Sequence, residues 1–168
     1  MSIDSKEITL EIVGVGIVFH SPKSAEHIPE GADYLSAMYT TEQQVQSHIQ
    51  KGSIVGFGTG SPGTFILKFH SGYPDEDFIE QCEFKLRLGL HCRGGIVCFR
   101  DLYELMDWRT TCPVKQCIEL QDGYYHVTLC SNTPPSGTLG DNQLIDVYLQ
   151  KLDAFPKLSK EGIPTLCM

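Results

Sequence analysis

The sequence predicts an all-β protein, an antiparallel β-sandwich of seven or eight strands with one or two short helices in loops. The clearest evidence is residues 82–92, C-E-F-K-L-R-L-G-L-H-C, where apolar and polar side chains alternate for a whole strand. Such a one-sided strand favours an antiparallel sheet, because parallel strands are buried on both faces and read as continuous apolar runs. Regular turn residues between further short apolar stretches indicate a sandwich. The apolar face of the clearest strand consists of Phe84, Leu86, Leu88 and Leu90.

Residues 7–20 read as the first strand, and its alternation changes register at Val13. Gly14 and Gly16 stand beside that change and would accommodate a bulge or bend. Residues 21–52 differ in kind: they are polar and contain prolines, so we expect an insertion there, with a helix from about Asp33 to Ile49.

Turn residues divide the remainder into short elements. We expect strands at 53–57, 64–69, 80–92, 96–99, 117–120, 124–131 and 144–152, and a short helix or turn at 101–108. Gln121-Asp122-Gly123 is a hairpin signal between the fifth and sixth of these strands. The chain after about residue 155 contains prolines and is predicted to be a loose tail. Residues 1–168 form one predicted domain, which is typical of this length.

The composition limits the possible functions. The net charge is −8, and the 13 lysines and arginines are scattered singly. Direct binding to nucleic acid is therefore disfavoured, because such proteins concentrate positive charge on one face. The N-terminus lacks the apolar stretch of a signal peptide, and no apolar run approaches the roughly 20 residues that span a bilayer. We expect a cytoplasmic protein without membrane contact, whose seven cysteines are free thiols.

Two sequence patterns suggest chemistry that their surroundings do not support, and a third kind of motif is missing. Gly58 to Gly63 matches G-x-G-x-x-G, but a strand follows where the dinucleotide motif needs a helix, so we interpret it as a hairpin turn. Cys112 and Cys117 lack a second ligand pair at zinc-finger spacing, so no metal or other cofactor is predicted. No nucleophile motif is present, and we predict no enzyme. An enzyme with an unusual site around Tyr124, His126 or Cys130 stays open.

Two acidic clusters are the remaining candidates for function. Such clusters are usually solvated surface. Aspartates on loops at one end of a sandwich also bind calcium, provided that several carboxylates converge. A third possibility is docking to the basic groove of a nuclease, with aromatic side chains supplying affinity and carboxylates supplying steering. The candidate partner-binding residues are Asp75, Glu76, Asp77, Asp101, Glu104, Asp107, Tyr103 and Trp108.

The order of three segments resembles the competence protein J family. The segments are I-T-L-E-I-V-G-V-G-I-V-F-H (8–20), G-S-I-V-G-F-G-T-G-S-P-G-T-F-I-L-K-F (52–69), and the stretch from Cys82 through G-G-I-V-C-F-R (94–100) to I-E-L-Q-D-G-Y-Y-H-V-T-L-C (118–130). Members of that family are small cytoplasmic inhibitors of a DNA-entry nuclease. This chain differs in an extra strand region at 141–155 and an excess of cysteines. The resemblance implies a role but assigns it to no residue.

The resulting hypothesis is a cytoplasmic inhibitor or immunity protein that neutralises a nuclease or nuclease-like toxin through an acidic-aromatic surface. Its partner would be a basic protein, and neither nucleic acid nor membrane would be bound directly. The alternative is a calcium- or lipid-binding module like a C2 domain, which would need at least four converging carboxylates.

Overall fold

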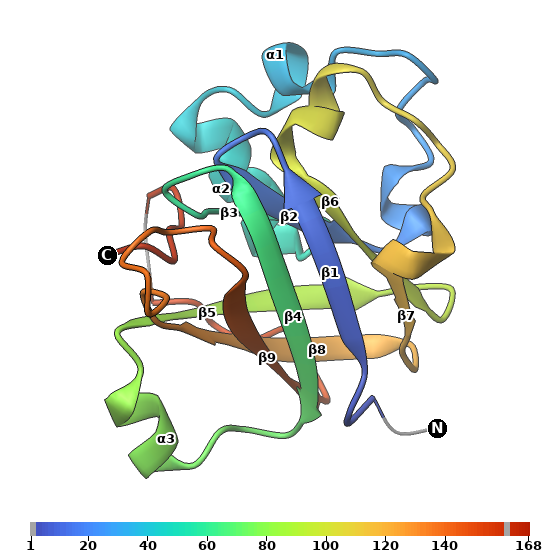
Figure 1. The fold of residues 1–168 in the computed structure, drawn as a ribbon. Helices are drawn as coiled ribbons and strands as arrows, with labels where there is room; N and C mark the ends of the chain where they lie inside the picture. The colour runs from blue at the N-terminus through green and yellow to red at the C-terminus, as the bar shows by residue number, and fades with distance from the viewer. Residues whose placement is uncertain (1–2, 160–161) are drawn as a thin grey trace.

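The described residues of the computed structural model, 3–159 and 162–168, form nine strands in two sheets (Figure 1). The larger sheet has the order β1-β4-β9-β8-β5. Its strands are β1 (Glu7–Ile12), β4 (Gly63–Ser71), β9 (Gln143–Leu152), β8 (Gly123–Ser131) and β5 (Phe84–Cys92). The smaller sheet has the order β3-β2-β6-β7. Its strands are β3 (Ile54–Gly58), β2 (Gly16–His20), β6 (Ile96–Asp101) and β7 (Cys117–Glu119).

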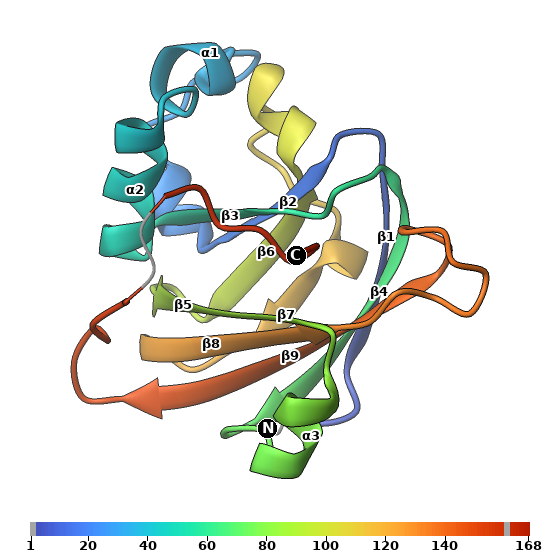
Figure 2. The same cartoon turned by 90° about the vertical axis from the view of Figure 1, so that its left-hand side faces the viewer.

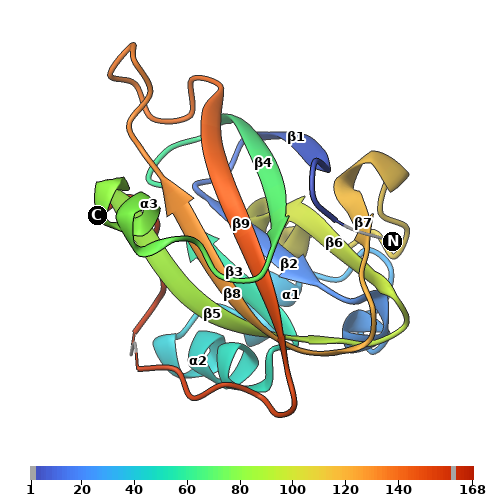
Figure 3. The same cartoon turned by 90° about the horizontal axis from the view of Figure 1, so that it is seen from below.

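The prediction of a mostly β protein is confirmed, but two of its details are wrong. The described chain contains nine strands rather than seven or eight, and β4 pairs with β9 in parallel, from Phe65 opposite Gln143 to Ser71 opposite Leu149. Figure 3 shows β9 between β4 and β8. Because β9 is half exposed, its residues alternate as those of an antiparallel strand do, and the sequence does not distinguish the two ladder types.

Three connections run from one sheet to the other. The sequence predicts a continuous strand at the first of them and hairpins at the other two. The predicted first strand is β1 and β2, separated by a turn at 13–15. The Gly58–Gly63 turn links β3 to β4, and the Gln121–Gly123 signal links β7 to β8; neither pair of strands is hydrogen-bonded. Alternation shows which side chains face the core, but not which strand lies alongside, so the hairpin interpretations are wrong.

Side chains from both sheets fill one core. The ring of Phe99 on β6 lies 5.6 Å from that of Phe19 on β2 and 5.1 Å from that of Phe69 on β4. The alternation predicted for β5 is confirmed: its apolar residues are buried, whereas Lys85 and Arg87 are exposed. Burial of this apolar area is the main stabilising contribution to the fold.

The polar insertion contains three separate helices in place of the one continuous helix predicted from the sequence. It contains the 3₁₀ helix η1 (Pro22–Ala25) and the helices α1 (Tyr34–Met38) and α2 (Glu42–Lys51), which lie together at one end of the molecule (Figure 2). The predicted helix is interrupted because Thr41 starts a new one, forming a capping box with Gln44. Val45 and Ile49 anchor α2 on the core.

Helices elsewhere are short. They are α3 (Glu76–Gln81) and the 3₁₀ helices η2 (Leu102–Met106) and η3 (Val114–Gln116). The described chain thus has three α-helices and three 3₁₀ helices, where the sequence predicts one or two short helices. None of the helices in the described ranges has the length and apolar character to cross a membrane.

The C-terminal segment is attached to the smaller sheet, contrary to the predicted loose tail. Leu166 is buried, and its N–H donates to the carbonyl of Gly58 over 2.8 Å. Thr165 forms a parallel bridge with the same glycine. Closer to β9, the ring of Phe155 lies against Gly89, where a Cβ atom would come within 2.5 Å of it.

Candidate protein-binding surface

The eight sequence-predicted residues fall into two groups at opposite ends of the molecule. Asp75, Glu76 and Asp77 begin α3, at the bottom of Figure 1. The other five residues lie in or beside η2, the yellow segment that follows β6 next to α1 at the top. One continuous acidic-aromatic surface made of all eight is therefore ruled out by their placement.

Two members of the η2 group are buried. Trp108 is only 1% exposed, and its ring lies 4.1 Å from the guanidinium carbon of Arg100 and 5.3 Å from the ring of His20. Stacking of a cation on an indole stabilises both buried groups. The carboxylate of Asp101 accepts hydrogen bonds from the N–H groups of Val13 (2.8 Å) and Gly14 (3.3 Å). These two side chains hold the fold together and are not accessible to a partner.

The remaining acids of the η2 group are compensated. Glu104 pairs with Arg100 at 3.1 Å and also accepts from the N–H of Asp101, completing a capping box. Asp107 pairs with Arg109 at 2.8 Å. Tyr103 is partly exposed, but it lies beside carboxylates whose charge nearby arginines already offset.

The acids of α3 are different, because they are exposed and the two neighbouring cations contact other groups: Lys85 donates to the carbonyl of Ile79, and Arg87 lies over the ring of Tyr73. Asp75, Glu76, Asp77 and the following Glu80 are all exposed. Within the described part of the chain, no salt bridge reaches any of these carboxylates. Four unpaired negative charges within six residues produce a strong local field, which speeds association with a positively charged partner.

Aromatic rings lie beside these acids, on the outer face of the larger sheet. His70 on β4 stacks on Tyr148 of β9 at 4.4 Å, and Phe78 of α3 lies 5.8 Å from the same tyrosine. Tyr73, two residues before Asp75, is 46% exposed, and its hydroxyl is 3.0 Å from Nδ1 of His126 on β8. We call this surface the α3 face. It consists of His70, Tyr73, Asp75, Glu76, Asp77, Glu80, His126 and Tyr148.

The surroundings of two rings of the α3 face, His126 and Tyr148, favour their neutral forms. Burial, and then the positive charge of Arg87, lower the pKa of His126 below its ordinary value. Burial, followed by the charge of Asp146, raises the pKa of Tyr148. The face thus combines partly exposed rings, one of which lies under the guanidinium of Arg87, with a rim of carboxylates. Aromatic side chains at the centre and charges at the rim are the usual anatomy of a protein interface.

Alternation along β8 predicts part of this face. Tyr124, His126 and Thr128 share one side of their strand, which indicates a polar face. His70 and Tyr148 were missed, because only the parallel pairing of β4 with β9 places them opposite each other. Nothing in a single sequence predicts that pairing.

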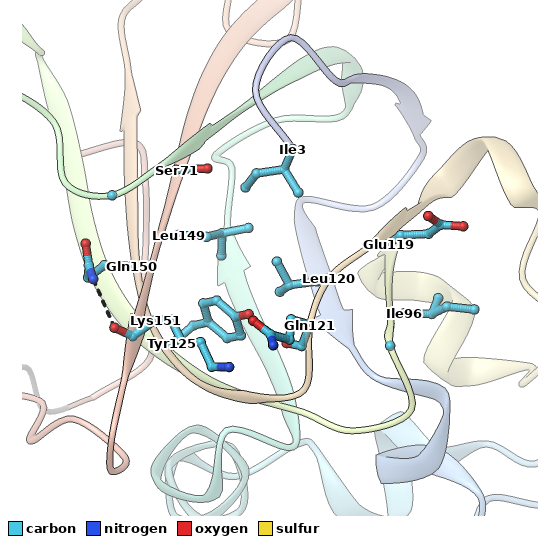
Figure 4. Close-up of a pocket in the computed structure, with 12 residues that line it drawn as sticks. Ile3, Ser71, Ile96, Glu119, Leu120, Gln121, Tyr125, Leu149, Gln150 and Lys151 are labelled. Atoms are coloured by element: carbon cyan, nitrogen blue, oxygen red, sulfur yellow. Dashed lines mark hydrogen bonds between the residues drawn. The ribbon is translucent and has the colours of Figure 1, made fainter. Parts of the chain in front are cut away.

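A separate hollow of about 990 Å³ lies at the end of β9, near the free edge of β7 (Figure 4). Leu120, Tyr125, Leu149 and Lys151 are among its lining residues. Tyr124, His126 and Cys130 do not line it, so the unusual enzyme site considered from the sequence has no cavity there. The hollow contains one acidic and one basic side chain, Glu119 and Lys151, and no catalytic arrangement within its described lining.

Carboxylates do not converge on a calcium site in the described residues. The one group of three or more potential metal ligands found there consists of thiols, from Cys98, Cys112 and Cys117. The C2-like alternative requires at least four carboxylates around one ion and therefore has no support from this geometry.

Comparison with known proteins agrees with this architecture. No protein-family model matches the chain, and no curated protein matches its sequence. Among solved structures, ComJ of Bacillus subtilis, an inhibitor of the DNA-degrading activity of NucA, aligns over 90% of this chain and 99% of its own, with a TM-score of 0.51 and 13% identity. The fold is similar to that of ComJ. The predicted resemblance is thereby confirmed at the level of the fold.

The same fold occurs in a second context. A protein described as Crocagin biosynthetic gene J aligns over 84% of this chain and 94% of its own, with a TM-score of 0.53 and 14% identity. At such low identity neither similarity transfers a function, so function has to be argued from the surface.

Proposed function

We propose that this chain is a non-catalytic protein that binds and inhibits a nuclease or nuclease-like toxin in the cytoplasm through the α3 face. The observation that carries the proposal is the set of four exposed, unpaired carboxylates beside partly exposed rings. The fold similarity to a nuclease inhibitor, ComJ, supports the same role.

The physical match is between opposite charges. A nuclease groove that holds a phosphate backbone is lined by basic side chains, and carboxylates on another protein compete for the same positions. Because no salt bridge in the described part of the chain reaches the acids of α3, these carboxylates give up no internal ion pair on binding. Tyr73 and Tyr148 would lie near the centre of the contact, where aromatic side chains contribute most of the affinity.

The proposal retains three of the eight sequence-predicted residues and replaces the others. Asp75, Glu76 and Asp77 stay as the acidic rim. Trp108 and Asp101 are removed from the binding surface because they are buried, and Glu104 and Asp107 because arginines compensate them. Tyr103 is removed with them, because it lies in the same η2 segment, away from α3.

The test is affinity capture from the cells that naturally produce the chain, followed by a DNA-degradation assay. We expect a nuclease to be captured in stoichiometric amounts and its purified activity to fall when the chain is added back at a one-to-one ratio. A captured set without any nuclease, together with no inhibition of the nucleases encoded by the same cells, would contradict the proposal.

The surface is tested with charge-matched variants. The triple variant Asp75→Asn, Glu76→Gln, Asp77→Asn removes three charges from the α3 face. A control variant, Glu11→Gln, Glu26→Gln, Asp153→Asn, removes three exposed charges elsewhere. Weakened inhibition in the first variant alone would support the α3 face. Equal weakening in both would indicate a net-charge effect without a specific surface.

A further inference from the structure

Three cysteines distant from the α3 face converge at the β6–β7 edge of the smaller sheet. Cys98 lies on β6, Cys117 begins β7, and Cys112 lies in the segment between η2 and η3. Their Sγ atoms all lie within 4.8 Å of one another, and those of Cys98 and Cys117 are 3.3 Å apart. Cys98 is buried and the other two are half-buried.

Strand pairing explains how residues so far apart in the sequence meet. Cys98 and Cys117 are directly opposite each other in the antiparallel β6–β7 ladder. The side-chain amide of Gln116 donates to the carbonyl of Phe99 over 2.8 Å, which fixes the entry into β7. The spacing of Cys112 and Cys117 lacks a partner pair in the sequence, but the fold brings Cys98 to them as a third thiol.

The separation of these sulfurs suits a tetrahedral metal site. Zinc–sulfur bonds of about 2.3 Å in a tetrahedron place neighbouring sulfurs roughly 3.8 Å apart. The observed group, with one pair at 3.3 Å and none beyond 4.8 Å, reaches that geometry through small side-chain rotations. A disulfide would join only two of the three sulfurs.

The local charge suits the same occupant. Three thiolates around a divalent cation carry a net charge of −1. The buried guanidinium of Arg100 acts electrostatically on both Cys112 and Cys117, and it has one carboxylate partner, Glu104. A buried charge is tolerated when an opposite charge lies nearby, so Arg100, which also pairs with Glu104, offsets part of the net charge of the loaded site.

We propose that Cys98, Cys112 and Cys117 bind a thiophilic d¹⁰ cation, zinc in the cell, with a fourth coordination position left to water or to a partner. Thiolate ligands select zinc or copper(I) over calcium and magnesium. The metal attaches the 107–116 segment to the β6–β7 edge, and so stabilises the region that holds Trp108 and Arg100. Metal bound to the folded state alone raises the unfolding temperature.

The experiment is a titration of the full-length, fully reduced protein with cadmium, followed by ultraviolet thiolate-to-metal charge transfer, and with zinc, followed by equilibrium dialysis. A phosphine reductant keeps the thiols free without supplying a competing thiol. We expect one equivalent of metal, an absorbance corresponding to three thiolates, and a higher unfolding temperature with zinc.

The half-buried Cys112 offers the most informative variant, because Cys112→Ser is nearly isosteric and leaves the β6–β7 pair intact. We expect at least tenfold weaker metal binding and loss of about one third of the cadmium–thiolate absorbance, since one of three ligands is removed. Cys167→Ser is the matched control: this cysteine is also half-buried and lies outside the group. Its metal binding should equal that of the wild type.

Three results would overturn the proposal. The first is no stoichiometric binding of either metal by the reduced wild-type protein at micromolar concentrations. The second is equal binding by the Cys112→Ser and wild-type proteins, which would assign the metal to other residues. The third is a Cys98–Cys117 disulfide that persists under the reductant, which would make the pair a covalent link instead. None of these readouts depends on a nuclease partner.

Discussion

The segments around α3 and η2 resemble each other as sequences: one places four and the other three acidic residues close together beside aromatic ones. Their structures differ in what faces the carboxylates. Around η2, the carboxylates of Asp101 and Glu104 are taken up by backbone N–H groups and by Arg100. Around α3, no described salt bridge reaches the acids. We therefore place the proposed binding surface at the cluster whose carboxylates form no described salt bridge.

The substitution expected to have the largest effect on stability is Trp108→Ala, and it tests this difference between the two regions. We expect a loss of about 3–5 kcal/mol in the free energy of unfolding, the usual cost of truncating a buried tryptophan. Arg100 would also lose the ring on which it stacks. Tyr73→Ala on the α3 face should cost about 1 kcal/mol or less, because an exposed side chain has little packing to lose. Urea denaturation measures both, and equal costs would abolish the distinction between the two regions.

Acidification should weaken the region around Arg100 through His20. Burial, with a smaller effect of Arg100, lowers the pKa of His20 from 6.5 to about 4, against the hydrogen bond that its Nδ1–H donates to the carbonyl of Ser21. The unfolded chain therefore binds a proton at a higher pH than the folded one. Stability should fall as the pH drops from about 6.5 to 4, by at most about 3 kcal/mol for a shift of this size.

The control for this pH dependence is His20→Gln, which keeps a polar side chain beside Arg100 but cannot titrate. Its unfolding free energy should vary less between pH 6.5 and 4 than that of the wild type, as measured by denaturation at each pH. An unchanged slope would show that other groups cause the acid sensitivity.

Asp101→Asn should cost about 1–3 kcal/mol, because the carboxylate accepts hydrogen bonds from the turn between β1 and β2 and an amide satisfies these donors less well. Asp107→Asn, which removes an exposed carboxylate from the same segment, should change stability by less than about 0.5 kcal/mol. Thermal unfolding compares the two. A larger effect at Asp107 would reverse the assignment of structural and surface roles.

The smallest effect on stability is expected for the triple variant Asp75→Asn, Glu76→Gln, Asp77→Asn, within about 0.5 kcal/mol. Its effect should appear in association instead. We expect the association rate with the captured nuclease to fall by about tenfold or more at low salt, and by less at high salt, because the charges act by steering. Stopped-flow mixing at two salt concentrations measures this, and a salt-independent loss would argue against steering.

Strand β5 and helix η2 show which features of the fold can be predicted from the sequence. The alternation of residues 84–90 determines a strand and its buried face, because burial of apolar side chains depends on the strand period alone. The partner of a strand depends on long-range packing. A single sequence therefore does not predict that the chain crosses to the other sheet after β1, β3 and β7, nor that β4 pairs with β9 in parallel. Asp101 and Glu104 do have the spacing of a capping box, a signal that identifies them as structural residues.

The cysteine group also depends on strand pairing that a single sequence does not predict. The spacing between Cys112 and Cys117 is short enough to notice, but Cys98 joins them only through the register of β6 against β7. Ligand sets assembled across strands leave no local motif. The acids of α3, by contrast, are exposed, as a short run of charges after a proline-containing turn predicts; their role in binding stays a prediction.

The parallel pairing of β9 has a consequence for how the molecule is made. Because β9 lies between β4 and β8, the larger sheet is completed only when the chain has been synthesised beyond Leu152. Until then, β1–β4 and β8–β5 are two separate ribbons, each with an open edge and an apolar face. Sheets closed late by distant strands fold slowly and expose edges to aggregation. A nascent chain of this protein is therefore most vulnerable just before its last strand emerges from the ribosome.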